Sequence, residues 1–222
     1  DPDLVKGIIA GGPPALVRAA EGAEDDEDAG RTAITDAAVG EPDFVLGIAA
    51  SGTTPFVAAA LEQALAVGAG TGLLTCSEPP EQLAARVDHQ ITIRTGPEAI
   101  VGSTRLKAGT ATKLALNTIT TATMIRLGKV YGNLMVDLRA TSKKLEDRSI
   151  RIIEALTGLD RTPAEDLLAA ADGSVKTALA MHGMKVDRPV AEQRLEACDG
   201  FLAECLERFP PPPEDGTGEP EA

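Results

Sequence analysis

The chain has 222 residues and a hydrophobic fraction of 43%, enough for one α/β domain with a small appendage. Its formal charge of −13 opposes binding to nucleic acid and to anionic membrane surfaces. With no Trp, one Tyr and four Phe it also lacks the aromatic side chains on which bases stack, so neither nucleic acid nor membrane is expected as a partner.

Four short apolar runs predict β-strands, because they are rich in aliphatic and β-branched residues. They cover residues 4–11, 43–50, 72–76 and 90–95, and we expect them to be buried on both faces. Helical patterns lie between them and begin at Pro14, Pro55 and Pro79. Strands that alternate with helices predict an α/β fold with a parallel sheet covered on both sides.

The chain after residue 96 has an almost wholly helical pattern. Long helices are predicted at 104–127 and 141–156, with a less regular stretch between them, and shorter ones at 162–172, 174–183 and 191–209. The organisation we expect is an α/β domain at 1–157, a small helical subdomain at 158–208 and a disordered, acidic, proline-rich tail at 209–222.

The cysteines and histidines give no sign of a metal site. Cys76, Cys198 and Cys205 are too few and too poorly spaced for a zinc site or a disulfide framework, and His89 and His182 stand singly. Reduced thiols indicate a cytoplasmic protein, and no run of about 18 apolar residues predicts a membrane span. The sequence begins with Asp rather than Met and enters a predicted strand without a signal-peptide pattern, so we expect further residues upstream.

The sequence SGTTP joins the predicted strand at 43–50 to the helix at Pro55. A glycine and small hydroxyl residues at such a turn place backbone N–H groups and the hydroxyls of Ser51, Thr53 and Thr54 at a helix N-terminus, where an anion is favoured. Ligands of open α/β sheets also bind at the carboxyl ends of strands. A phosphate therefore fits this turn; the alternative is that Ser51 or Thr53 only caps the helix.

A second candidate segment, residues 96–113, leads into the long helix at 104–127. Ser103 and Thr104 could cap this helix, whereas Arg105 and Lys107 place two cations where the helix dipole disfavours them. The cations would be tolerated if they faced an anionic ligand or a carboxylate. The alternative is that both are surface groups paired with acids.

Three segments follow one another in a recognisable order. They are AGG followed by AAEGAEDD, then GIAASGTTPFV, and then GPEAIVGSTRLKAGTATKLALNTITTATMIRLGKVYGNLMVDL. Together they resemble the N-acetylmuramic acid 6-phosphate etherase family of the sugar isomerase (SIS) superfamily, which also includes the glucokinase regulatory protein. The third segment is highly specific, and the resemblance covers residues 3–208.

The resemblance implies a three-layer α/β/α sandwich around a parallel sheet, with residues 1–157 forming a sugar-phosphate-binding SIS domain, usually in a homodimer. It also implies cleavage of the D-lactyl ether of N-acetylmuramic acid 6-phosphate, without metal or organic cofactor. The second glutamate of the family's EGAED segment falls on Glu24, the implied base at C2 of the sugar. The implied substrate-binding residues are Ser51, Gly52, Thr53 and Thr54 of the phosphate loop and Ser103, Arg105 and Lys107 of the family signature.

The chain departs from the family at its N-terminus. The family's other glutamate and a first glycine-rich loop lie upstream of the strand predicted at 4–11, and the nearest look-alike, CSEPP at 76–80, follows the wrong strand. We therefore interpret Glu78 as a helix-start acid. A missing first strand would leave neighbouring strands with unpaired edges and exposed apolar area, so we expect these 222 residues alone to be poorly soluble and inactive.

Two other functions remain open at this stage. A non-catalytic sugar-phosphate sensor needs the phosphate loop but no complete acid–base pair, and an oligomerisation module needs neither. The acidic run EGAEDDED at 21–28 is expected to be a solvated turn apart from Glu24.

Overall fold

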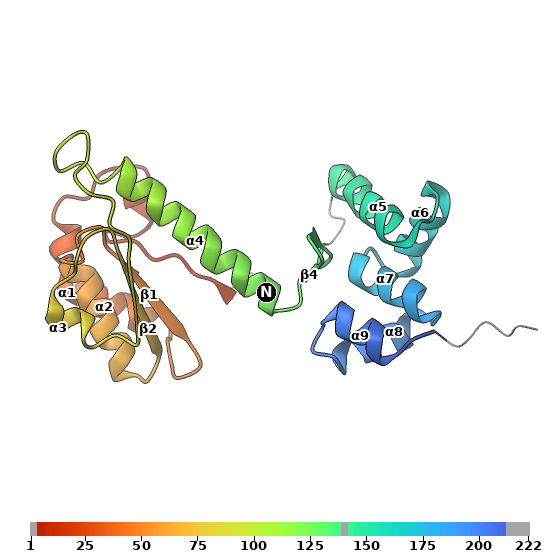
Figure 1. Ribbon diagram of the computed structural model, residues 1–222. Coiled ribbons are helices and arrows are strands. Elements are labelled where there is room, and N and C mark those ends of the chain that lie inside the picture. Colours follow the sequence, from red (N-terminus) through yellow and green to blue (C-terminus); the bar gives the residue numbers. More distant parts are fainter. Residues whose placement is uncertain (1–3, 139–141, 212–222) are drawn as a thin grey trace, which may run out of the picture. The chain divides into compact units, whose positions relative to one another are not determined.

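A computed structural model describes residues 4–138 and 142–211, which divide into a first unit ending at Asn117 and a second unit beginning at Thr118 (Figure 1). The first unit contains a three-stranded parallel sheet and its helices, and the second contains a two-stranded hairpin and five helices among its described residues. The predicted α/β fold with a helical C-terminal part is therefore confirmed. Within residues 4–138 and 142–211, no helix has both the length and the apolar character of a membrane span.

The elements alternate in the first unit and are mainly helical afterwards. The first unit contains the 3-10 turns η2 (Pro13–Leu16) and η3 (Ala23–Asp25), α1 (Glu27–Asp36), β1 (Phe44–Ile48), α2 (Pro55–Ala66), β2 (Gly70–Thr75), α3 (Glu81–Ala84) and β3 (His89–Thr92). Helix α4 (Lys107–Arg126) begins in the first unit and ends in the second. The second continues with β4 (Val130–Tyr131), β5 (Leu134–Met135), α5 (Lys143–Thr157), α6 (Arg161–Ala170), α7 (Val175–Met184), α8 (Arg188–Glu196) and α9 (Leu202–Arg208).

The sheet has the order β1-β2-β3, with both pairs parallel. Helix α2 connects β1 to β2 and packs on both strands, as a crossover between parallel strands requires. Gly47 of β1 permits this contact, because a Cβ there would lie 2.6 Å from Leu61 Cδ1. Leu61 and Leu73, the register partner of Gly47 in β2, are both fully buried and belong to the core of the first unit.

The strand predicted at 4–11 is wrong, because residues 6–9 have no regular secondary structure. A strand needs a neighbouring ladder for its backbone groups, and β1 pairs only with β2 among the described residues. Apolar side chains around the free edge are consequently exposed, including Leu4, Val5 and Phe44. Burial on both faces is likewise confirmed for β2 but wrong for β1 and β3, which lie at the edges of the sheet.

The helix predicted from Pro14 is wrong as well, since only the short turns η2 and η3 form there. Gly22, near the end of the predicted helix, has a positive φ angle that a continuous helix does not contain. A helix that was not predicted, α1, begins instead inside the acidic run. Its first turn is favoured by two acids, Glu27 and Asp28, which face the positive end of the helix dipole.

The second unit has its own core, to which α5, α6, α7, α8 and α9 contribute. Along α5, Ser149, Ile150, Ile152 and Ile153 are buried, and α7 is buried over most of its length. The helix predicted at 191–209 forms as two helices, because Asp199 and Gly200 take positive φ angles between them. The less regular stretch before α5 contains the β4–β5 hairpin, and most of the predicted tail, residues 212–222, lies outside the described residues.

Helices α1 and α2 approach very closely at Gly30. A Cβ at this position would lie 2.3 Å from the backbone oxygen of Phe56, so a side chain there requires the two helices to separate. Gly109 in α4 is also helical, but a Cβ there would meet its nearest neighbour, the Thr104 oxygen, at an ordinary 3.5 Å. Both glycines are helical and lie in the first unit, and they differ in the space available for a Cβ, so Gly109 is a control for Gly30.

We expect Gly30→Ala to lower the free energy of unfolding of the first unit by about 1–3 kcal/mol, because the gain in helix propensity is outweighed by overpacking. Gly109→Ala is expected to raise it by about 0.5–1 kcal/mol. Urea denaturation of the full chain, followed by hydrogen exchange in α1 and α4, measures both. Equal effects of the two substitutions would contradict the close-approach argument.

Candidate functional site

A cavity of about 590 Å³ lies beside β1 in the first unit. Every residue of β1 lines it, together with apolar residues from the 4–10 segment, α1 and α2. Its polar lining includes Glu24, Ser51, Thr54 and Thr104. These four residues come from three separate segments of the sequence, and they include Glu24 and two of the phosphate-loop residues predicted from the sequence.

The turn after β1 is fixed by hydrogen bonds within itself. Gly52 N donates to Ala49 O at 3.1 Å, and the hydroxyls of Ser51 and Thr53 lie 2.8 Å apart. Gly52 has a φ of 76° and packs against Pro79, where a Cβ would approach Pro79 Cβ to 2.7 Å. Only glycine fits both the angle and the space, which gives Gly52 a structural role in the turn.

The N-terminus of α2 has no side-chain cap. Thr54 is the N-cap residue and its hydroxyl makes no capping hydrogen bond, while Ser51 Oγ accepts from Thr53 N at 3.3 Å within the turn. The alternative in which Ser51 or Thr53 caps this helix is therefore wrong. The positive end of the α2 dipole lies beside the cavity, an arrangement that favours an anion.

Helix α4 is capped by a residue from outside the helix. Glu98 accepts from Lys107 N at 3.0 Å and from Ala108 N at 2.9 Å, so it takes the role considered for Ser103 and Thr104. These hydrogen bonds, with that of Ala108 first, hold the pKa of Glu98 below its ordinary value. The sequence indicated that a carboxylate could face Arg105 and Lys107, but it did not identify Glu98, whose partners lie nine and ten residues away.

The predicted residues of the α4 segment are only partly brought to the cavity. Thr104 lines it, whereas Ser103, Arg105 and Lys107 do not. Ser103 N bonds to Ile100 O at 3.0 Å in a turn, and Arg105 and Lys107 are exposed. Their predicted roles in substrate binding stay predictions.

The acidic run divides into residues with different roles. Glu24 lies in η3, is exposed and lines the cavity, whereas Asp26 accepts from Ala29 N at 2.9 Å and caps α1. Gly22, in the left-handed conformation, turns the chain into η3 and so separates Glu24 from Glu21.

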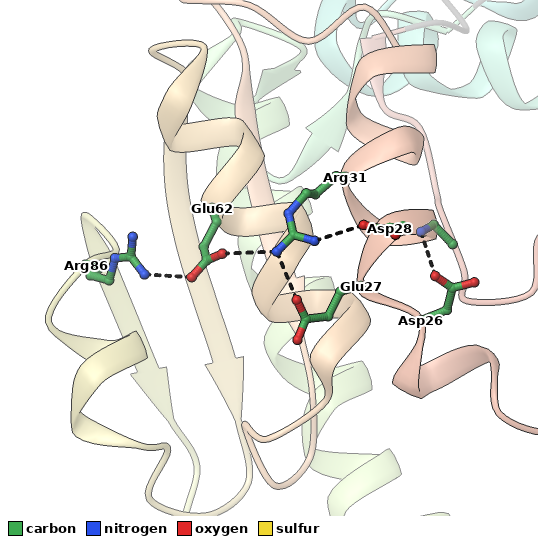
Figure 2. A network of polar contacts seen from close by, with 7 residues as sticks. Asp26, Glu27, Asp28, Arg31, Glu62 and Arg86 are labelled. Carbon is green, nitrogen blue, oxygen red and sulfur yellow. Dashed lines mark hydrogen bonds and ion pairs between the residues drawn. The ribbon is translucent and has the colours of Figure 1, made fainter.

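The next two acids, Glu27 and Asp28, pair with Arg31 of their own helix, and Arg31 reaches across to α2 (Figure 2). Arg31 pairs with Glu27 at 2.9 Å and with Asp28 at 3.3 Å. It also reaches Glu62 of α2 at 3.7 Å, and Glu62 binds Arg86 at 2.6 Å. The hydrogen bond with Glu27 raises the pKa of Arg31 most. Glu27 and Asp28 therefore orient Arg31 within α1, Arg31 links α1 to α2, and neither acid lines the cavity.

The carboxyl ends of β2 and β3 carry a second polar cluster. Ser77 Oγ donates to Ala50 O at 3.2 Å, which ties the end of β2 to the turn after β1. Glu78 binds Arg94 at 2.6 Å, and α3 begins three residues after Glu78, at Glu81. Glu78 is thus an ion-pair partner rather than the helix-start acid that we expected. Within residues 4–138 and 142–211, no group of three or more His, Cys, Asp or Glu could hold a metal ion.

Most of the chain is similar to known proteins of one family. Residues 2–65 match the glucokinase regulatory protein N-terminal SIS domain. The chain is 48% identical to an N-acetylmuramic acid 6-phosphate etherase of Synechococcus elongatus over 209 residues, which cover 94% of this chain and 68% of the relative. It is 46% identical to the protein of the same name from Bacillus subtilis, covering 95% and 69%, and 50% identical to that of Salinibacter ruber, covering 93% and 67%.

The capping role of Asp26 within the acidic run at 21–28 can be tested by measuring the free energy of unfolding of variants. We expect Asp26→Ala to destabilise α1 by about 0.5–2 kcal/mol, because it removes the cap from Ala29 N. Asp25→Ala is the matched control, since it removes the same charge from the neighbouring position, and it should change stability by less than about 0.5 kcal/mol. Urea denaturation of both variants measures the difference, and equal losses would show that charge rather than capping matters here.

Proposed function

The chain belongs to the N-acetylmuramic acid 6-phosphate etherase family, and we propose that it cleaves the D-lactyl ether of N-acetylmuramic acid 6-phosphate to N-acetylglucosamine 6-phosphate and D-lactate. This activity makes it a carbon–oxygen lyase of amino-sugar and peptidoglycan recycling. Similarity at 48% identity over 94% of the chain is the observation that carries the proposal. The cavity supports it, because Glu24 and the turn after β1 line the same space.

The phosphate group of the substrate is assigned to the turn at Ser51, Gly52, Thr53 and Thr54. The uncapped N-terminus of α2 supports this placement, because its backbone N–H groups and dipole favour a dianion. Helix α4 is a weaker choice, since the carboxylate of Glu98 already occupies its first N–H groups. Ser103, Arg105 and Lys107 are proposed to contact the substrate from the segment before α4.

Glu24 is proposed as the base. In the open-chain sugar C1 is an aldehyde, which acidifies the C2 proton; Glu24 removes this proton, the C3–O bond breaks, and lactate leaves with a proton on its oxygen. Water then adds across the unsaturated intermediate, with its hydroxyl at C3 and a proton at C2. Proton transfer by a placed carboxylate contributes about 10² to 10⁴ in rate. No step of this sequence calls for a metal or an organic cofactor.

We further propose that the enzyme is a cytoplasmic homodimer. All three cysteines are free and buried, which suits a reducing compartment. A sugar-phosphate substrate also suits the cytoplasm, because its charged phosphate prevents it from crossing membranes unaided.

A non-catalytic sugar-phosphate sensor is the second candidate. It is favoured by the match of residues 2–65 to the glucokinase regulatory protein domain. A sensor would bind N-acetylglucosamine 6-phosphate and be stabilised by it, but it would release no D-lactate. Lactate release therefore separates the two functions.

Glu24→Gln is expected to reduce D-lactate release from N-acetylmuramic acid 6-phosphate at least about 10²-fold, because the amide cannot accept the C2 proton. Glu21→Gln is the matched control, since it lies in the same acidic run on the other side of Gly22. It should retain activity within about threefold. Lactate release by the wild-type chain would contradict the inactivity that we expect from the sequence, whereas folded chain that binds N-acetylglucosamine 6-phosphate without releasing lactate would sink the enzyme assignment.

The phosphate assignment predicts a ligand-specific defect. We expect Ser51→Ala combined with Thr54→Val to weaken binding of N-acetylglucosamine 6-phosphate by about tenfold or more, because hydrogen bonds to a charged phosphate are strong. Calorimetry with the unphosphorylated sugar is the control, and its weak binding should not change. A similar loss for both sugars would place the phosphate elsewhere.

A further inference from the structure

Glu98 closes the loop at residues 99–106, between β3 and α4. Its two carboxylate oxygens accept from Lys107 N and Ala108 N, at 3.0 and 2.9 Å, nine and ten residues further along the chain. The carboxylate therefore joins the two ends of the loop. It is also the anion that balances the cation of Lys107 at the start of α4, where the first turn contains no acid.

The loop has little apolar packing of its own. Ile100 and Val101 are 66% and 96% exposed, so their side chains do not anchor it. Its backbone hydrogen bonds include the turn from Ser103 N to Ile100 O and, where it enters α4, the bonds from Gly109 N to Thr104 O and from Thr110 N to Leu106 O. The carboxylate of Glu98 is consequently the strongest connection between the beginning of the loop and its end.

The start of α4 is itself anchored to the sheet. Ala108 is 3% exposed, and its carbonyl oxygen lies 3.6 Å from Cys76 Sγ, just after β2. Cys76 Sγ also lies 3.5 Å from Thr112 Oγ1, one turn further along α4. By binding the N–H groups of Lys107 and Ala108, Glu98 thus fixes the loop to a rigid point near the carboxyl end of β2.

Thr104 is the loop residue that lines the cavity with Glu24, Ser51 and Thr54. We propose that Glu98 is a positioning residue, which holds the 99–106 loop closed and thereby keeps Thr104 at the substrate site. Glu98 touches no reacting atom and acts through the two backbone N–H groups. This inference rests on the proposed function, because the ligand that Thr104 would meet is the sugar phosphate.

A double-mutant cycle on the full chain tests the inference, with N-acetylglucosamine 6-phosphate as the probe. Glu98→Ala is expected to raise its Kd by about tenfold and to speed hydrogen exchange at the amides of Lys107 and Ala108 by a similar factor, because both lose their acceptor. Glu98→Gln keeps one acceptor oxygen and should lie between Glu98→Ala and the wild type in both measurements. Glu81→Gln, at the exposed start of α3, is the matched control and should change neither.

Thr104→Val distinguishes direct contact of Thr104 with the ligand from positioning of the loop by Glu98. It should raise the Kd while leaving exchange at Ala108 unchanged, and the double variant Glu98→Ala with Thr104→Val should bind no worse than the weaker single variant. Additive losses, or faster exchange in Glu98→Ala without a change in Kd, would overturn the inference. A wild-type chain that binds the probe and follows this pattern but releases no D-lactate would instead defeat the proposed function alone.

Discussion

The hydrogen-bond ladder between β1 and β2 is the constraint on which the candidate site depends. It continues past both strands, from Ala49 N to Leu74 O at 3.1 Å and from Cys76 N to Ala50 O at 2.9 Å. The turn that carries Ser51 therefore starts from a fixed backbone rather than from a free loop. Because the pairing is parallel, the chain after β2 arrives at the same edge, where Cys76 meets the start of α4. Loss of this register would displace the turn and the α4 segment together.

The starts of α1, α2 and α4 differ in how their backbone N–H groups are satisfied. Asp26 caps α1 from the adjacent position, and Glu98 caps α4 from nine residues upstream. Thr54, the N-cap residue of α2, makes no side-chain capping bond. A helix N-terminus without an internal anion, next to a cavity, favours an external one. The overall charge of −13 makes this local arrangement necessary, because the long-range field of the protein repels a phosphorylated sugar.

Local patterns predicted the existence of β1 to β3 and of the long helices, because aliphatic runs and helical periodicities describe these elements, although only β2 is buried on both faces. They failed at 4–11, where the apolar run has strand composition but no neighbouring ladder. The start of α1 was missed because Asp26 resembles any other acid in EGAEDDED, and only the hydrogen bond to Ala29 N distinguishes it. Glu98 was beyond local patterns, since its partners lie nine and ten residues away. The resemblance to a family identified Glu24, whose position in the short turn η3 between Gly22 and α1 has no periodic signal.

The elimination also needs a proton for the departing lactate oxygen, and the described acids near the site constrain its source. Glu98 cannot supply it, because two N–H donors hold its pKa low and keep it ionised at neutral pH. Glu78 has its oxygen engaged by Arg94 at 2.6 Å. Asp43 lines the cavity, but it accepts from Gly40 N at 2.8 Å and lies just before β1, at the opposite end of the strand from the turn that carries Ser51. Glu24 itself becomes a carboxylic acid once it has taken the C2 proton. It can return that proton to the leaving oxygen only if C2–H and C3–O lie on the same face of the sugar, since one carboxylate cannot reach both faces. A site that works with Glu24 alone is therefore restricted to syn elimination, whereas anti elimination requires a second acid on the opposite face.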